Sequence, residues 1–468
     1  MEKNFSQKRW YHALSIAMVI VAFTVPAKAQ FLRTSYFMEG VPDRMYLNPA
    51  LFPTGGYVSI PVIGSINATA LSNSMGSKNI SDLFDDDDSF YSNSAFRNNL
   101  KNVNRINMSV NTNVISLGWY GGKGFWSVNI GARTDVDAKI DRSLFDYLYE
   151  ADKEGFKWDG TKYDIKNSEV NLNTYSEIGL GYARRINEKL SIGVKGKVLL
   201  GTGNASLEVN NIHLEGNLPD ENATEAEILA HQSDYYAKIA TDATLKSSLK
   251  GLKLKYKTDS EGNEYVSGMK MDGYGIGGYG AALDLGLSYE ILDNLTLSAS
   301  VVDLGFSIWN KKSNKSASSK TTRNYDYTNY KDFEDIAGNG DVLNYEMLDL
   351  KMEDGTSSRR TSLAPTFAAG AEYALPCKKL SFGVLYTNRN TKTNDISEFT
   401  MSANYRPKNW FNIAATYSVI QSAGQSFGLG LKLGVLYIGT DYMYLGNNSK
   451  CLNAQVGITV PLGKGKMK

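Results

Sequence analysis

The clearest pattern along the chain is the alternation of apolar and polar residues. From Leu285 to Ser300 the sequence reads LGLSYEILDNLTLSAS: large apolar residues take every second position, a short turn interrupts the run, and the pattern resumes. Such alternation is typical of β-strands, whose successive side chains point to opposite faces of a sheet. One face of each strand therefore meets an apolar medium, and the other meets polar or closely packed groups.

The alternating runs are long. Many span about 9–11 residues or more, the length that a tilted strand needs to cross a bilayer, whereas strands of soluble sheets average ~5–6 residues. Tyr and Trp often stand near the ends of the runs, where a membrane barrel carries its aromatic girdles. We predict fourteen strands, at 56–70, 103–118, 124–140, 168–185, 189–207, 270–291, 294–309, 361–376, 379–389, 397–406, 410–421, 425–433, 435–445 and 452–463.

Short and long connections alternate along these strands. The turns at 121–123, 187–188, 292–293, 377–378, 407–408 and 434 are tight, and most of the connections between them are long: 71–102, 141–167, 208–269 and 310–360. An even strand number, short turns at one end and long loops at the other are typical of outer-membrane barrels. The strands of a soluble β-sandwich alternate as well. The prediction of a membrane barrel therefore rests on the strand lengths, the aromatic residues at the strand ends and the loop lengths.

The predicted fold is an all-β, transmembrane antiparallel up-and-down β-barrel of about 14 strands, present as a monomer. Only a closed sheet leaves no unpaired strand edge in hydrocarbon. We expect the long loops to be solvated extracellular segments, with a short helix within 221–250. Cys377 and Cys451 would lie at opposite ends of the barrel and form no disulfide.

The polar faces of the strands would line the lumen. We expect the charged side chains there to pair across the interior, because an unpaired buried charge is costly. Two roles stay open for them, plain packing of the lumen and selection of a solute. The candidates are Glu177, Lys195, Lys197, Asp284, Glu290, Glu372, Arg406 and Lys432.

Residues 1–29 have the features of a secretory signal peptide. Basic residues precede an apolar run at 13–25 that is too short for a membrane helix of ~20 residues, and Ala27 and Ala29 suit signal peptidase. Cleavage after Ala29 would leave Gln30 first. It would remove four of the 50 basic and one of the 49 acidic residues. The nearly neutral remainder argues against a nucleic-acid partner.

Few residues suggest catalysis or metal binding. His12 would leave with the signal peptide, and His213 and His231 fall in the long loop 208–269, which disfavours a Ser-His-Asp hydrolase or a His-rich metal site. The Asp-rich run 82–88 lacks the glycine and closing glutamate of an EF-hand and fits a solvated loop. We therefore expect no enzyme, no cofactor and no metal.

The segment Tyr46-Leu47-Asn48-Pro49-Ala50-Leu51 stands just before the first predicted strand. It resembles the Asn-Pro-Ala segment that precedes strand one in the FadL-type long-chain fatty-acid transporters. It is also similar to that of the related PorV and PorP-like barrels of the type IX secretion system of Bacteroidota. The same resemblance covers the fourteen-strand count and the run 429–442. Overall the chain looks most like a Bacteroidota barrel family of unknown function with the opening Arg33-Thr34-Ser35-Tyr36-Phe37-Met38. The chain departs from many outer-membrane proteins by ending in 463–468 without an aromatic residue, and a simple turn around Pro49 is the alternative for the motif.

The resemblance implies an organisation and two functions. Residues 30–55 would fold into the lumen as a hatch or plug anchored by Asn48, Pro49 and Ala50, and residues 56–468 would form the barrel. The first function is gated passage of a small hydrophobic molecule through the outer membrane. The alternative is a non-conducting scaffold for secreted or surface proteins. Outer-membrane lipid is a partner in both.

Overall fold

The computed structural model describes most of the chain after residue 32. The predicted signal peptide and the Asp-rich run 82–88 lie outside the described residues. These are 33–59, 66–76, 79, 94–151, 153, 155–220, 222–258, 264–337, 345–353, 357–443 and 449–464.

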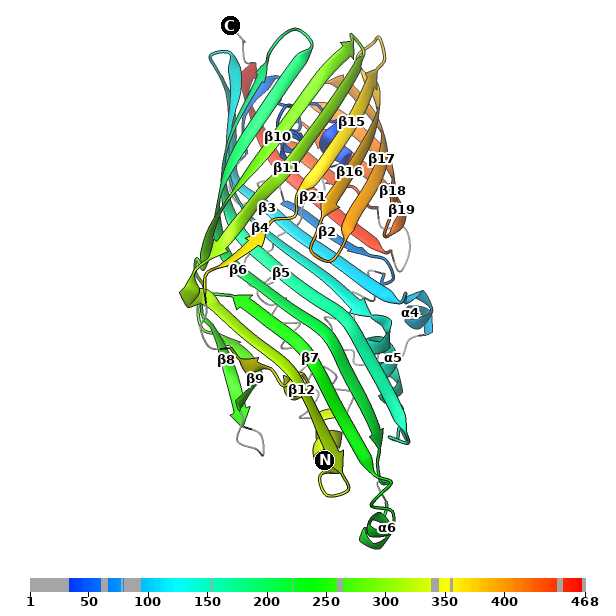
Figure 1. The fold of residues 1–468 in the computed structure, drawn as a ribbon. Helices are drawn as coiled ribbons and strands as arrows, with labels where there is room; N and C mark the ends of the chain where they lie inside the picture. Colours follow the sequence, from blue (N-terminus) through cyan, green and yellow to red (C-terminus); the bar gives the residue numbers. More distant parts are fainter. Residues whose placement is uncertain are drawn as a thin grey trace.

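The core of the molecule is a closed barrel of 14 antiparallel strands (Figure 1). The first barrel strand consists of β1 (Gly55–Ser59) and β2 (Ile66–Ser72), and the eighth of β14 (Arg359–Ser362) and β15 (Thr366–Ala374). The others are β3 (Val103–Gly121), β4 (Gly124–Asp141), β5 (Thr161–Arg185), β6 (Leu190–Asn217), β10 (Gly278–Leu292), β11 (Leu295–Trp309), β16 (Leu380–Asn390), β17 (Asp395–Lys408), β18 (Phe411–Ile420), β19 (Gly424–Leu433), β20 (Leu436–Thr440) and β21 (Cys451–Lys464).

The barrel closes between its first and last strands. Val58 of β1 pairs with Val460 of β21 on one side and with Leu117 of β3 on the other, and β2 repeats the arrangement farther along. The predicted fold class and strand number are therefore confirmed. Cys377 and Cys451 are both free, as predicted.

The outward face of the barrel is apolar. On β10 the side chains of Tyr279, Leu283, Leu285, Leu287 and Tyr289 are all exposed. Strands β6, β11, β16 and β17 add Ile192, Val194, Val198, Leu297, Leu304, Ile308, Phe382, Val384, Tyr386, Phe399, Met401 and Tyr405. We call this surface the apolar belt. Among the described residues of β6, Val198 is the last large apolar side chain that is exposed, although the strand continues to Asn217.

Beyond the belt, much of the predicted long loops 208–269 and 310–360 forms strands and helices, of which the sequence analysis expected only a short helix within 221–250. β7 (Tyr236–Ser248) pairs with the extension of β6, and β12 (Asn314–Asp326) pairs with β7. The predicted helix within 221–250 exists as α6 (Glu225–Ala230), but residues 236–248 are a strand. Alternation of small and apolar buried residues on β7 marks it as a strand with one packed face.

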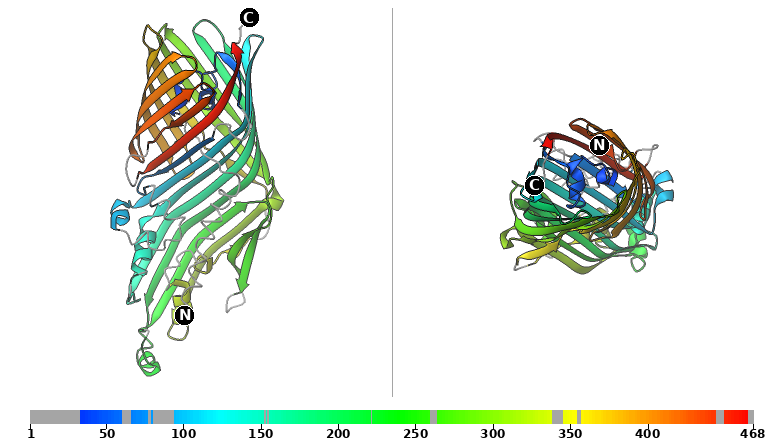
Figure 2. Two further views of the ribbon diagram at one scale, coloured as in Figure 1. Left: turned by 180° about the vertical axis from the view of Figure 1, so that it is seen from behind. Right: turned by 90° about the horizontal axis from the view of Figure 1, so that it is seen from above.

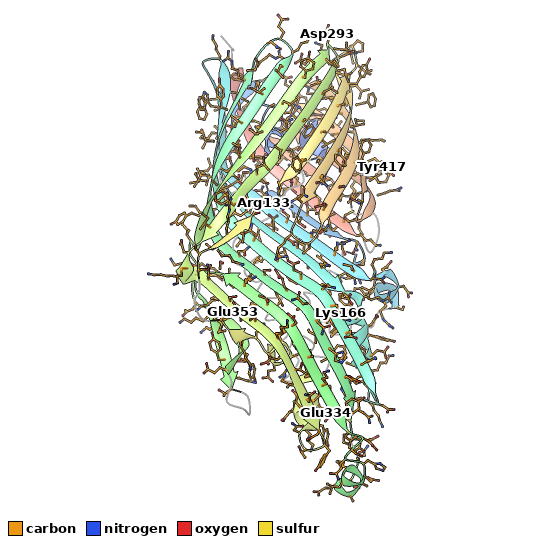
Figure 3. All side chains as sticks on the ribbon, viewed as in Figure 1. Arg133, Lys166, Asp293, Glu334, Glu353 and Tyr417 are labelled. Atoms are coloured by element: carbon orange, nitrogen blue, oxygen red, sulfur yellow. The ribbon has the colours of Figure 1, made fainter. Side chains whose placement is uncertain are left out.

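These elements enclose a hydrophobic core of their own. The helices α5 (Arg142–Ala151), α7 (Tyr330–Ala337) and α8 (Tyr345–Leu348) lie against the extended strands, and the rings of Trp158 and Phe333 meet edge to face at 4.9 Å. We call this assembly, with β7, β12 and the extensions of β5 and β6, the outer unit. It fills the lower half of Figures 1 and 3, with Asp293 at the opposite, short-turn end and Arg133 between them.

Smaller elements complete the chain. α4 (Ser94–Asn99) follows β2, the hairpin β8 (Leu252–Thr258) and β9 (Glu264–Met271) follows β7, and η4 (Lys311–Ser313) and the short β13 (Lys351–Met352) flank β12. Among the described residues, no helix is long and apolar enough to cross a membrane.

The outer unit should depend on the side chain of Phe333, which is fully buried. We expect Phe333→Ala to destabilise it by about 3–5 kcal/mol, the cost of a large core cavity. Hydrogen exchange by mass spectrometry should then show faster exchange in β7 and β12 but not in β16–β19. The matched control is Phe382→Ala in the belt, where the ring is exposed. Unchanged exchange in the outer unit would show that this core does not hold it together.

Candidate functional site: the barrel lumen

An N-terminal segment, residues 33–51, lies inside the ring of strands (Figure 2, right). It contains the short helices α2 (Arg33–Tyr36) and η2 (Pro42–Tyr46), and almost all of its residues are buried. Its hydrogen bonds reach β3, β10, β11, β16, β17 and β18, so it touches the wall on opposite sides. The segment therefore occupies the lumen of the barrel.

Arg33 fixes one end of this segment. Its guanidinium forms an ion pair with Glu398 at 2.9 Å and donates to the Tyr442 hydroxyl at 2.6 Å and to the Thr387 hydroxyl at 3.1 Å. The Tyr442 hydroxyl in turn donates to Glu398 at 2.6 Å. The carboxylate of Asp441 accepts from the backbone N–H groups of Arg33 and Thr34. A buried cation is tolerable only when paired and hydrogen-bonded in this way.

The predicted motif Asn48, Pro49 and Ala50 lies against the wall formed by β6 and β10. The Asn48 amide donates to the backbone oxygens of Leu287 at 3.2 Å and Ala299 at 3.3 Å, and its side-chain oxygen accepts from the N–H of Ala50 at 3.0 Å. Asn48 thus both caps a turn and hydrogen-bonds to the wall.

Two wall glycines permit this close approach. Gly193 and Gly286 are cross-strand partners. A Cβ on Gly193 would lie 2.3 Å from the backbone carbon of Pro49, and one on Gly286 would lie 2.1 Å from the side-chain oxygen of Asn48. Both positions need glycine because backbone and motif atoms occupy the space of a side chain.

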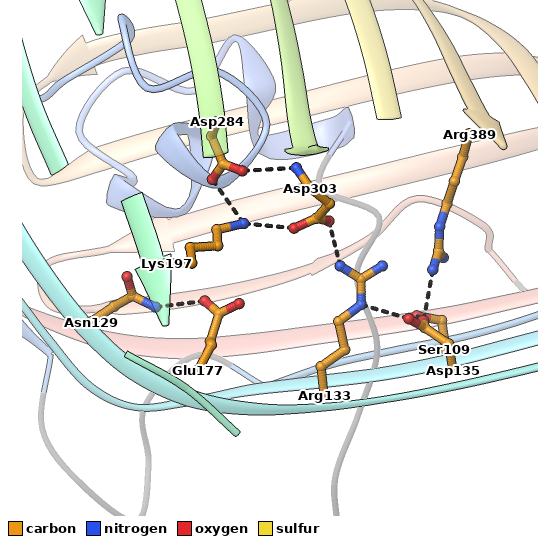
Figure 4. Close-up of polar contacts among 9 residues, drawn as sticks. All are labelled: Ser109, Asn129, Arg133, Asp135, Glu177, Lys197, Asp284, Asp303 and Arg389. Carbon is orange, nitrogen blue, oxygen red and sulfur yellow. Dashed lines mark hydrogen bonds and ion pairs between the residues drawn. The ribbon is translucent and has the colours of Figure 1, made fainter. Parts of the chain in front are cut away.

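A network of alternating charges crosses the lumen beside the N-terminal segment (Figure 4). Lys197 pairs with Asp284 at 2.8 Å and Asp303 at 2.6 Å. Asp303 also pairs with Arg133 at 2.5 Å, and Arg133 pairs with Asp135 at 2.9 Å.

Arg389 of β16 reaches the same Asp135 at 2.7 Å. Three cations and three anions are thus linked in one chain, and all of them except Asp135, whose side chain is 13% exposed, are almost fully shielded from water. Because β16 and β4 are not neighbours in the barrel, the network ties separate parts of the wall together.

The eight charged residues predicted for the lumen fall into two groups. Lys197 and Asp284 belong to the network. Glu177 and Lys195 lie near it: Glu177 accepts from Asn129 at 2.7 Å, and the Lys195 ammonium lies 4.5 Å from the centre of the Tyr46 ring.

The other four lie closer to the short-turn end. They make separate contacts: Glu290 with Arg185, Glu372 with Ser381, Arg406 with Glu39 of the N-terminal segment, and Lys432 with the backbone oxygen of Asn409.

Four network residues were missed by the sequence analysis: Arg133, Asp135, Asp303 and Arg389. The first two follow the inward alternation of β4, and Arg389 follows that of β16, so their pattern alone could have identified them. Asp303 is different, because it has a left-handed φ of 62° at a bulge where β11 loses register with β10. The sequence could have indicated this bulge by a shift in the alternation along β11: the exposed apolar side chains stand at odd positions at Leu297 but at even positions at Leu304 and Ile308.

A cavity of about 480 Å³ adjoins the network on the side of the outer unit. Asp135 and Arg389 contribute to its wall, together with amides, hydroxyls and a few apolar side chains. Arg359 lines it and donates to the Ser248 hydroxyl and the Asn204 side-chain oxygen, but it has no carboxylate partner among the described residues. The buried side-chain nitrogen of Asn107 has no hydrogen-bond partner among them. Other lining residues are Met108, Val136, Asp137, Asn171, Asn173, Asn204, Ser206, Leu363, Pro365 and Lys392.

Comparisons with known proteins give one family and several structures. Residues 49–441 match the model of a family of unknown function, DUF5723. No curated protein matches the chain. The toluene transporter TbuX of Ralstonia pickettii is similar in structure at 9% identity, with 90% of this chain and 93% of that one covered and a TM-score of 0.42.

Two further solved structures are similar. The toluene transporter TodX of Pseudomonas putida is 9% identical over 92% of this chain and 93% of that one, with a TM-score of 0.38. A FadL homologue of Pseudomonas aeruginosa is 10% identical over 93% and 97%, with a TM-score of 0.37.

Gly193→Ala should displace the motif from the wall, because the added methyl group meets the backbone of Pro49. We expect faster hydrogen exchange in residues 33–51, with the barrel strands unchanged. Gly196→Ala is the matched control on the same strand, since a Cβ there has open space. Equal exchange in both variants would show that the glycine contact does not position the motif.

Glu398→Gln should loosen the other end of the segment. It keeps the shape of the side chain but leaves the Arg33 guanidinium without its carboxylate, and breaking a buried pair costs about 3–5 kcal/mol. We expect proteolysis within residues 33–47 to become faster. The double variant with Arg33→Met removes both charges and should recover part of the protection; no recovery would argue against the ion pair as the cause.

Proposed function

The chain belongs to the DUF5723 family, whose function is unknown, and from the geometry of the lumen we propose that it is an outer-membrane barrel for gated passage of a small molecule. The cavity carries this proposal: it adjoins the outer unit at one side and meets the charge network, through Asp135 and Arg389, at the other. A solute that entered from the outer unit would stop at this barrier.

The apolar belt supports a position in a membrane. Its side chains would be in contact with lipid tails, and the closed sheet satisfies the backbone hydrogen bonds that hydrocarbon cannot. In this proposal residues 1–29 direct export and are removed after Ala29, and the outer unit faces the outside of the cell.

The N-terminal segment would be the gate. It is attached to the barrel through the few residues between Leu51 and β1. Its other contacts include hydrogen bonds, the ion pairs Arg33–Glu398 and Glu39–Arg406, and side-chain packing, which can be released without breaking a strand pair. Release would open the short-turn half of the lumen, whereas movement of any wall strand would expose unpaired backbone groups.

The cavity lining favours an amphipathic solute over a purely hydrophobic one. Met108, Val136 and Leu363 offer apolar contact, but Arg359 and Asn107 would lose water to a hydrocarbon and gain no hydrogen bond. We therefore propose a small molecule with an apolar part and a polar or anionic group.

A second candidate function is a non-conducting scaffold for a secreted or surface protein. The observation that favours it is the hydrophobic core of the outer unit, which gives the long connections a fixed shape that a partner could recognise. In that case the N-terminal segment would be a permanent part of the barrel interior.

Deletion of residues 31–54 tests the two functions against each other. If the segment is a gate, the deletion should produce stable ion conductance in planar bilayers where the full chain gives none or brief openings. The charge network would remain in place, so we expect a narrow channel whose conductance rises further with Arg389→Gln. No conductance in either deletion variant, with the barrel folded as judged by its heat-dependent shift in gel mobility, would contradict passage and favour the scaffold.

A further inference from the structure

Three segments meet at one corner of the molecule, where β11 gives way to β12: residues 248–252, 272–278 and 309–314. The N–H of Gly277 donates to the backbone oxygen of Gly201 at 2.8 Å, and the N–H of Asn310 donates to that of Gly277 at 2.9 Å. The N–H of Asp272 donates to Gly251 at 2.8 Å. The corner projects at the left of Figure 1, between barrel and outer unit.

This corner lies directly past the edge of the apolar belt. At this edge the belt ends with Tyr279 on β10 and Ile308 on β11, whose side chains face outward and are 56% and 47% exposed. In the next segment Tyr274 is 61% exposed and Ile276 is also exposed. An exposed tyrosine beside an exposed aliphatic residue at this depth is typical of the boundary between lipid tails and head groups.

The corner and the adjoining hairpin of β8 and β9 carry an excess of positive charge. Among the described residues, only Lys253 and Lys257 of this region have ion pairs, with Asp272 and Glu346. Five other exposed lysines have no ion pair with any described residue: Lys250, Lys255, Lys270, Lys311 and Lys312. By contrast, Lys392 near the cavity has two carboxylate partners, Glu169 and Glu208.

The charged and apolar groups are contiguous. The side chain of Lys250 lies against Gly275, between the exposed Tyr274 and Ile276: a Cβ on Gly275 would be 3.2 Å from the Lys250 ammonium. A lysine whose stem lies beside exposed apolar residues holds its ammonium at the level of the lipid head groups.

We call Lys250, Lys311 and Lys312 with the segments that carry them the lysine corner. We propose that it binds the phosphate groups of lipids in the outer leaflet. The inference rests on the membrane position in the proposed function, with the outer unit outside. Lysine ammonium groups bind phosphate as compact charges. The adjacent Tyr274 and Ile276 favour a lipid over a soluble acidic partner, because they would contact the acyl chains below the same phosphates.

The test compares one lipid with and without its phosphates. The full chain, purified in an uncharged detergent, is titrated with diphosphorylated lipid A and with its dephosphorylated form, and bound lipid is measured by native mass spectrometry. We expect the phosphorylated lipid to bind and the variant Lys250→Gln/Lys311→Gln/Lys312→Gln to weaken this binding about 100-fold, because three lysines near an anionic lipid surface are removed together.

The matched control is Lys123→Gln/Lys189→Gln/Lys379→Gln, which removes the same charge from the short-turn end and should leave binding unchanged. Equal binding of both lipids, or equal affinity in the two triple variants, would overturn the proposal. So would inorganic phosphate that binds the corner as tightly as the lipid. Conductance after deletion of residues 31–54 does not involve these lysines, so this proposal and the gate can fail separately.

Discussion

The structure depends on one constraint, the hydrogen bonding of backbone N–H and C=O groups between neighbouring strands of a sheet that has no free edge in the barrel. Closure is achieved where β1 and β2 lie between β21 and β3. Once the sheet is closed, strand alternation divides all side chains into an outward set and an inward set. The outward set is the apolar belt. The inward set is polar and has to satisfy its charges within the lumen.

The lumen meets that demand by pairing charges between strands and by filling space with the N-terminal segment. Asp303 is central because its carboxylate joins Lys197 to Arg133, and it reaches them only because the bulge in β11 turns it inward. The break between β14 and β15 lies opposite the same bulge. Local irregularity in the wall therefore coincides with the charge network and with the cavity beside it, at the height where a solute would be held.

The barrel is also strongly asymmetric in height, which creates the outer unit (Figure 2). β5 and β6 contain 25 and 28 residues, whereas β18 and β19 contain 10 each. The long strands extend beyond the belt on one side of the barrel only. There β7 pairs with β6, and β12 pairs with β7, so that the sheet continues outside the barrel. The polar cavity and the lysine corner both lie where the tall and short parts meet, so barrel and outer unit contribute jointly to each.

The sequence by itself determined the fold class, the strand number, the alternation of short and long connections, and the inward position of Lys197 and Asp284, because alternation is a property of each strand taken alone. It did not predict β7 and β12, whose short polar and small residues pack only because the β6 extension offers a paired edge. The contacts of Arg389 with Asp135 and of Arg33 with Glu398 were decided by tertiary structure. They join residues far apart in the chain, and their meeting depends on barrel closure and strand register, which no single strand pattern specifies.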